Sequence, residues 1–362
     1  MSVTSMKRWV FAGLLTATGL GSWCGLQHVY GGKPAPLPRV ISYMHSKRST
    51  LITDARIMDV NGANSLTLTG DLGSLTYSPG APRWSPDGQR LLFSSVAIPP
   101  ATSGTALASV AADGTGLRTI VTSAQVQAFI LANNPNGAIP NERMGDADWS
   151  PDGQWAVFSY PLGYPGVGGL SWGRIFAVRI ADGHLVQITD DVAAESHELP
   201  RWSRALNFIS YVVVPDWGPD PDHELWVTDP TGAARRQLIG PNSSTYVGLD
   251  AANWSHSGNP QTGESSLVFT SPTGAGPNRL VILDVDILAT DPIAGIEVIA
   301  SPTFELSNAS WSPDDTKLVM TRGSPGVAQI ATYDLVSGAT RVLLQVDTSR
   351  EGVGHPDWRA AP

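Results

Sequence analysis

The sequence is short of cysteine, of basic clusters and of helical periodicity, and each shortage excludes a class of protein. The one cysteine, Cys24, lies near the N-terminus, so the rest of the chain can hold neither an internal disulfide nor a thiolate metal site. After residue 48 the one adjacent basic pair is Arg235 and Arg236, and the formal net charge is −9. Nucleic acid is therefore not expected as a partner. Apolar residues spread between 37 glycines and 28 prolines favour a turn-rich β-protein.

The N-terminus has the order of an export signal. Lys7 and Arg8 precede the apolar run "WVFAGLLTATGLGSW", which is too short to span a bilayer comfortably. We expect a signal peptide or leader over residues 1–24, a linker over 25–37, and a periplasmic or secreted protein with no membrane span once the leader is removed. Lipid anchoring through Cys24 is the alternative, but Trp23 stands where such a motif has a small residue.

A tryptophan-centred segment recurs along the chain. Three copies are nearly complete, "PRWSPDGQRLLFSS", "ADWSPDGQWAVFSY" and "ASWSPDDTKLVMTR". The six tryptophans are Trp84, Trp149, Trp202, Trp254, Trp311 and Trp358. Their spacings of 47 to 65 residues suit a four-stranded unit with variable loops. We expect these tryptophans to fill the seams between neighbouring sheets, with ligand stacking as the alternative.

Between the tryptophans lie six alternating apolar segments, each with an Asp- and Gly-containing turn, which is the signal of a hairpin. One unit is therefore strand A, which ends in Trp-Ser, then a Pro-Asp-Gly turn, strand B, a variable loop, strand C, the Asp/Gly turn and strand D. Residues 39–70 supply strands B, C and D of a sheet without strand A, and 354–360 supply strand A alone. Joining them predicts an all-β, six-bladed β-propeller of four-stranded antiparallel blades over 38–362, closed by the C-terminal strand.

These repeats resemble the TolB-type (WD-repeat-like, PD40-type) β-propeller family of exported bacterial proteins. The resemblance rests on Trp-Ser-Pro-Asp-Gly followed by an apolar strand, and on segments such as "HLVQITD". It departs at Trp202, where "SRALN" replaces the turn, and at Trp254, where "SHSGNPQTGE" lengthens it. The resemblance implies an exported propeller, and in TolB itself the propeller protein binds protein partners; it does not imply TolB's own role for this chain.

Candidate site residues precede the tryptophans. His197 and Glu198 in "AESHELPRW", and His355 in "GVGHPDW", are expected near the mouth of the central channel. There they could bind a transition metal or act as acid and base, or simply form structural hydrogen bonds. The residues directly before the tryptophans include Arg83, Asp148 and Arg201. The predicted binding residues are these three together with His197, Glu198 and His355. Ion pairs between blades would explain this alternation of charge without a ligand.

Two other motifs have chemical alternatives. In "DWGPDPDHE", Asp216, Asp220, Asp222 and Glu224 offer carboxylates to calcium, but the spacing fits no standard loop, so a solvated acidic loop without cofactor is favoured. "GLSWG" (169–173) matches the nucleophile-elbow pattern, which requires a strand leading into a helix; a glycine-rich loop is favoured.

The longest insertions, 123–146, 161–173 and 215–224, fall on B–C or D–A connections, which share one face. We therefore expect a monomeric, protein-binding or scaffold propeller of the cell envelope with an envelope protein or peptide as partner. A propeller-type polysaccharide lyase or hydrolase with its site at the channel mouth is the alternative. His197, Glu198, Arg201 and His355 would carry that activity.

Overall fold

The computed structural model describes residues 38–49, 52–69, 81–96, 104–133, 139–140, 143–163, 171–190, 195–215, 223–241, 251–273 and 276–359. The predicted leader and linker, with Cys24, lie outside these residues. In the described part of the chain, no helix is long and apolar enough to cross a membrane.

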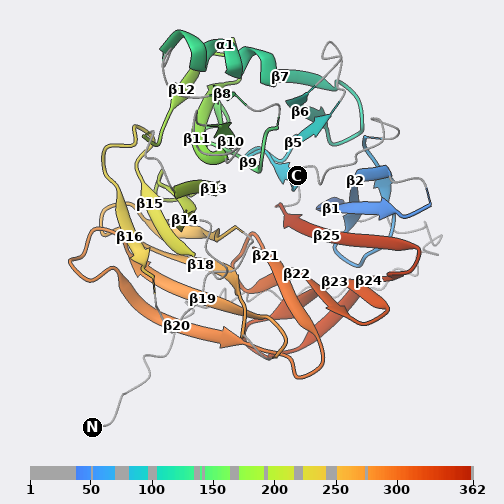
Figure 1. The fold of residues 1–362 in the computed structure, drawn as a ribbon. Coiled ribbons are helices and arrows are strands. Elements are labelled where there is room, and N and C mark those ends of the chain that lie inside the picture. Colours follow the sequence, from blue (N-terminus) through green and yellow to red (C-terminus); the bar gives the residue numbers. More distant parts are fainter. Residues whose placement is uncertain are drawn as a thin grey trace, which may run out of the picture. The chain divides into compact units, whose positions relative to one another are not determined.

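The described residues form six antiparallel sheets arranged as a ring, each built around four strands in the order A, B, C, D (Figure 1). Blade 1 comprises β25 (Glu351–Trp358), β1 (Arg39–Lys47), β2 (Ile52–Asp59) and β3 (Leu66–Thr67). Blade 2 comprises β4 (Arg83–Trp84), β5 (Arg90–Val96), β6 (Thr105–Ala111) and β7 (Arg118–Thr122). Blade 3 comprises β9 (Ala147–Trp149), β10 (Trp155–Gly163), β11 (Ser171–Arg179) and β12 (Leu185–Gln187), with β8 (Ile139–Pro140) also paired to β10. Blade 4 comprises β13 (Glu195–Trp202), β14 (Ile209–Pro215), β15 (Glu224–Thr228) and β16 (Arg236–Ile239). Blade 5 comprises β17 (Asn253–Asn259), β18 (Glu264–Ser271), β19 (Arg279–Asp286) and β20 (Ile293–Ile299). Blade 6 comprises β21 (Glu305–Trp311), β22 (Lys317–Ser324), β23 (Val327–Asp334) and β24 (Thr340–Asp347). The predicted six-bladed propeller is confirmed.

The ring closes through blade 1, which takes strands from both ends of the described chain. β25 pairs antiparallel with β1, with Trp358 opposite Ile41 and Asp357 opposite Ser42. The inner strands contact one another in cyclic order, β25, β4, β9, β13, β17, β21 and back to β25. The closing strand is therefore the one predicted from the tryptophan repeat.

The Trp-Ser-Pro-Asp turns share one hydrogen-bond pattern. In blade 2 the Ser85 hydroxyl donates to Asp87 Oδ1 at 2.6 Å and accepts from the Arg90 N–H at 2.9 Å. Gly88 has φ of +65°, a value that costs glycine little. The serines and aspartates of blades 3 and 6 repeat the pattern. In the irregular turn of blade 4, Asn207 takes the left-handed conformation instead.

The repeated tryptophans are buried in the seams between blades. The six side chains belong to residues that are 0 to 8% exposed. Trp149 Nε1 donates to the carbonyl of Arg83 in the preceding blade at 3.1 Å. Trp254 Nε1 donates in the same way to the carbonyl of Arg201, and Trp311 Nε1 to that of Asn253. The prediction that tryptophan fills the seam is confirmed.

The insertion 123–146, predicted as a loop, contains the helix α1 (Ser123–Asn133). Val126 and Ile130, four residues apart, are buried in the apolar core that surrounds Trp149. Thr122 and Gln125 form a capping box: the Thr122 N–H donates to Gln125 Oε1 at 2.9 Å, and the Gln125 N–H to Thr122 Oγ1 at 3.3 Å. The T-x-x-Q spacing is therefore a helix signal that the loop prediction missed.

Candidate functional site

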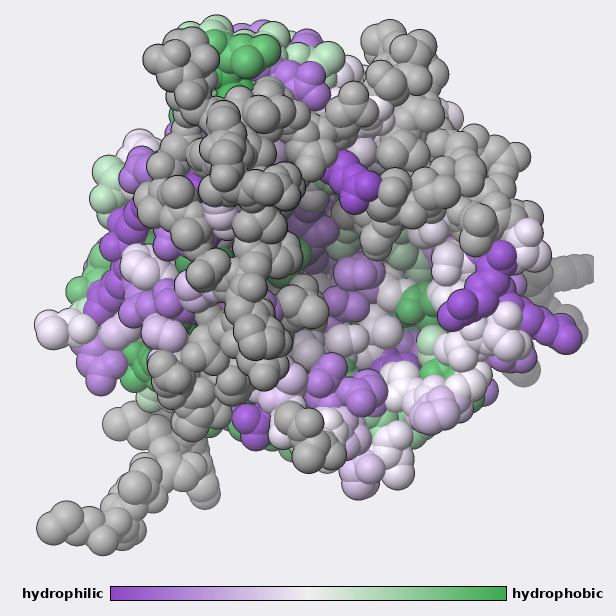
Figure 2. Space-filling view, viewed as in Figure 1, coloured by the Kyte–Doolittle hydropathy of each residue, from purple (hydrophilic) through white to green (hydrophobic). Residues whose placement is uncertain are grey.

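A small cavity lies at the inner strands, at one end of the central channel. Its volume is about 70 Å³, and its lining includes the residue three positions before each repeated tryptophan. These six residues are Ala81, Asp146, Leu199, Ala251, Asn308 and His355, and we call them the mouth ring. Strand A enters from the D–A connection, so the mouth ring lies toward the side of the longer connections. Where grey atoms do not cover it, the surface toward the middle of this view is largely hydrophilic (Figure 2).

Irregular backbone creates the mouth ring in three blades. Leu199, Asn308 and His355 have φ of +54°, +49° and +50°. The register with the neighbouring strand shifts near each of them. Such bulges redirect side chains away from the regular alternation of a strand. Positive φ is uncommon for leucine, so the fold imposes this conformation on Leu199 against its local preference.

Asp146 and Arg201 form a buried ion pair between blades 3 and 4. Arg201 Nη2 donates to Asp146 Oδ2 at 2.7 Å, and its Nε donates to Asn253 Oδ1 at 2.9 Å. Burial alone would raise the pKa of Asp146, but the charges of Arg201 and His355 outweigh burial and the pKa lies below its usual value. Asp146 is therefore a carboxylate at neutral pH, held at the mouth in a fixed orientation.

The residues directly before the tryptophans form a second ring, the seam ring, of Arg83, Asp148, Arg201, Asn253, Ser310 and Asp357. Arg83 lies between two carboxylates, with Nε 3.6 Å from Asp148 Oδ1 and Nη1 3.3 Å from Asp357 Oδ1. Asp148 accepts the backbone N–H of Trp202 at 3.0 Å, and Asp357 that of Trp84 at 2.9 Å. Ion pairs between blades are present from blade 1 to blade 4, and hydrogen bonds of Asn253 and Ser310 join the remaining blades.

Both signs of charge are stabilised in the seam ring. Burial would lower the pKa of Arg83, but Asp357 and Asp148 raise it overall. Burial would raise the pKa of Asp357, but Arg83 and Arg204 lower it overall. Arg83 and Asp357 are therefore both charged when the propeller is folded near neutral pH.

The predicted grouping of His197 and Glu198 with His355 at one site is wrong. His355 lines the mouth cavity, whereas the other two do not. His197 is 2% exposed and packs edge-on against Tyr211, with its Nε2 2.9 Å from Glu195 Oε1. Burial lowers the pKa of His197, so it is neutral at pH 7. The bulge between Glu198 and Arg201 changes which face each side chain takes.

Glu198 has a local partner: its Oε1 accepts from Ser196 Oγ at 2.6 Å. Of the predicted set, the structure places Arg83, Arg201 and His355 around one cavity and leaves Asp148 in the seam behind it. Asp146 and Asn308 were missed. Their common signal is the position three residues before the tryptophan, which the repeat alignment contains.

Glu224, one of the four predicted calcium ligands, is buried and accepts from Trp226 Nε1 and Gln237 Nε2, both at 2.7 Å. Asp216, Asp220 and Asp222 lie outside the described residues, so calcium binding there stays a prediction. Among the residues that the structure describes, no group of three or more His, Cys, Asp or Glu could hold a metal ion.

The described part of "GLSWG" lies on a strand. Ser171 begins β11, which pairs with β10 on one side and β12 on the other. A nucleophile elbow would require a strand that turns into a helix at this serine. The expected glycine-rich loop is therefore wrong at 171–173, which is strand, and no strand-to-helix turn is formed at Ser171.

No family model and no curated protein matches the sequence. Solved structures do resemble the fold. TolB from Acinetobacter baumannii is 16% identical with a TM-score of 0.57, covering 90% of this chain and 67% of that one. A putative TolB from Agrobacterium tumefaciens is 15% identical with a TM-score of 0.51, covering 89% and 99%. Hydrazine synthase from Kuenenia stuttgartiensis is 14% identical with a TM-score of 0.61, covering 89% of this chain and 46% of that one. Identities this low establish the propeller fold alone.

Proposed function

We propose that this chain is an exported binding propeller of the bacterial cell envelope, and that it holds a partner protein or peptide at the mouth ring. The observation that carries the proposal is the arrangement of this ring. Six residues at one repeat position, from six different blades, surround a single cavity. The export-signal pattern before residue 24 and the structural likeness to two TolB proteins support the envelope location.

Three of the six mouth-ring residues are polar, and Arg201 of the seam ring lies beside them in the cavity lining. The Asp146 and Arg201 side chains are fixed by their mutual bond, and Asn308 and His355 are two further polar side chains in the same lining. Because the side chains are positioned before binding, a partner loses less of its binding energy to ordering them. An extended peptide segment offers the alternating N–H and C=O groups that such a mixed polar ring can bind.

The test uses a matched pair of substitutions. Asn308→Gly keeps the positive φ and removes the amide from the mouth ring. Asn64→Gly is the control: Asn64 has φ of +54° but lies at the C–D turn of blade 1. Immobilised protein is used to capture partners from an envelope extract, and the captured protein is identified by mass spectrometry and its affinity measured with each variant.

We expect Asn308→Gly to weaken that affinity by roughly tenfold, the cost of about one good hydrogen bond, and Asn64→Gly to leave it unchanged. Equal affinity of both variants would count against the mouth ring as the binding site. The enzyme alternative is assayed in parallel: sugar release from acidic polysaccharides by the parent protein that disappears in His355→Ala would replace the binding proposal.

A further inference from the structure

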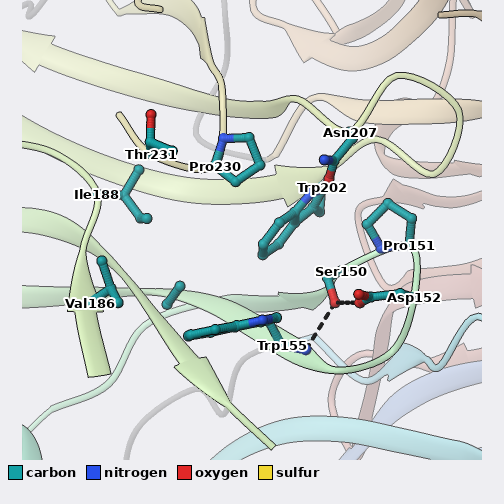
Figure 3. Close-up of a pocket in the computed structure, with 11 residues that line it drawn as sticks. Ser150, Pro151, Asp152, Trp155, Val186, Ile188, Trp202, Asn207, Pro230 and Thr231 are labelled. Carbon is teal, nitrogen blue, oxygen red and sulfur yellow. Dashed lines mark hydrogen bonds between the residues drawn. The ribbon is translucent and has the colours of Figure 1, made fainter. Parts of the chain in front are cut away.

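A second, larger cavity lies between blades 3 and 4, on the opposite side of the ring from the mouth. Its volume is about 630 Å³. Its lining comes from the Trp-Ser-Pro-Asp turn of blade 3, the A–B turn and C–D turn of blade 4, and the outer strands of blade 3 (Figure 3). The side chains are mainly apolar or aromatic, with Trp155 and Trp202 the largest.

Three positions explain why this seam holds a cavity. In blade 2 these positions hold Arg90, Ser109 and Arg118, which are long or polar. Arg90 Nε donates to Ser109 Oγ at 3.1 Å, and Arg90 Nη2 donates to the Gly116 carbonyl at 2.6 Å. The strand registers make them equivalent to three apolar positions in blade 3. The equivalent sets are Arg90, Ser109 and Arg118 in blade 2, and Trp155, Ala177 and Val186 in blade 3. Blade 6 resembles blade 2, with Lys317 in an ion pair with Asp334 at 2.8 Å.

Trp155 forms a flat wall of the cavity. Figure 3 shows its indole nearly edge-on, with a ring face toward the space below Pro230 and Ile188. His184 packs against this indole at 6.1 Å between ring centroids, with an interplanar angle of 72°, and the Arg179 guanidinium lies 5.6 Å from its centroid. These contacts restrict the ring, so its free face is presented in one orientation.

One acidic group stands at the edge of the cavity. Among the described residues, every hydrogen bond of Asp152 uses Oδ1, which accepts from Ser150 Oγ at 2.5 Å and from the Gln154 N–H at 2.9 Å. Asp152 is exposed and lines the cavity, so its negative charge lies at the cavity edge. Asn207 Oδ1 is occupied by Trp202 Nε1 at 2.9 Å, which fixes the second indole.

We propose that this cavity binds a small, flat, largely apolar molecule that carries a hydrogen-bond donor and no negative charge. Cavities of about 300–1,000 Å³ lined by aromatic and aliphatic groups with a few polar ones are the usual sites for such ligands. The Trp155 face provides stacking and Asp152 provides the negatively charged acceptor. Because the carboxylate of Asp152 repels anions, the site discriminates by charge.

Two fluorescent probes with one skeleton test the proposal. N-phenyl-1-naphthylamine is neutral and combines a flat naphthalene with one N–H donor, and 8-anilino-1-naphthalenesulfonate has the same skeleton with an added sulfonate. We expect saturable binding of one neutral probe per chain, and roughly tenfold weaker binding of the sulfonate. Asp152→Asn preserves the acceptor in the turn and should reduce the difference between the two probes. No saturable binding of the neutral probe, or equal binding of both, would overturn the proposal.

Variants locate the probe. The combined change Trp155→Arg, Ala177→Ser and Val186→Arg gives blade 3 the three side chains of blade 2 and should abolish binding. Trp155→Arg alone is the second variant if the combined one does not fold, as judged by near-ultraviolet circular dichroism and thermal melting. Ser109→Ala, at the equivalent place in blade 2, is the matched control and should bind as the parent does. Undiminished binding by a folded Trp155→Arg protein would refute the site.

Discussion

In every blade the mouth-ring and seam-ring residues lie only two positions apart along the chain, yet the two rings differ in their contacts and backbone. The seam ring is buried, and Arg83, Asp148 and Asp357 bond to one another or to the backbone of the next blade. All six mouth-ring residues line the small cavity, which Arg83, Arg201 and Asn253 of the seam ring also line, and three mouth-ring members have positive φ. The difference shows that charge near a propeller channel can serve blade cohesion, while the adjacent irregular positions are the ones where we propose that a partner binds.

The largest expected effect comes from removing the closing strand together with the one residue that it contributes to each ring. Deletion of 351–362 eliminates β25, which carries Asp357 and His355, and leaves the edge of β1 unpaired. We expect aggregation or loss of a cooperative thermal transition in calorimetry. Deletion of 360–362 alone is the control, because it retains β25. Cooperative melting of the longer deletion at the parent temperature would contradict closure through this strand.

The next effect separates the rings. Asp357→Ala removes the acceptor for the Trp84 N–H and a carboxylate of the buried Arg83, and should cost about 3–5 kcal/mol of unfolding free energy. Asn308→Gly, in the mouth ring, should change that free energy by less than about 1 kcal/mol. Urea denaturation followed by tryptophan fluorescence measures both. Similar losses for the two variants would remove the distinction between the rings.

Acid should weaken the seam ring. The folded-state pKa of Asp357 lies below the ordinary value of 3.8, so its stabilising effect is complete above that value and is lost as pH falls through the folded pKa. We expect the unfolding free energy to decrease as pH falls below about 4, and this decrease to be smaller in Asp357→Asn. Urea titrations at several pH values provide the measurement. An unchanged acid dependence in the variant would exclude Asp357 as a contributor.

A smaller pH effect should come from His197, which belongs to neither ring. Burial lowers its folded-state pKa below 6.5, so its contribution is complete above pH 6.5 and decreases as pH falls toward the folded pKa. His197→Gln should flatten the dependence of the melting temperature on pH just below 6.5. If the variant retains the full slope, another group is responsible.

The repeat made most of the fold predictable. Trp84 and its equivalents mark strand A, and the following Ser-Pro-Asp letters form one hydrogen-bonded turn in blades 2, 3 and 6. The site was less predictable, because a bulge such as that at Leu199 alters the alternation from which side-chain direction is inferred. The apolar cavity depends on three strands in register, so no single segment around Trp155 reveals it.

Closure through β25 also has a consequence for the timing of folding. Blade 1 combines strands separated by more than three hundred residues, and its inner strand is near the end of the chain. During synthesis, strand β1 therefore lacks its neighbour until Trp358 has left the ribosome. Long-range pairing of this kind slows folding. The ring therefore cannot close before β25 has been synthesised, and the blade that holds the first strand is the last to be completed.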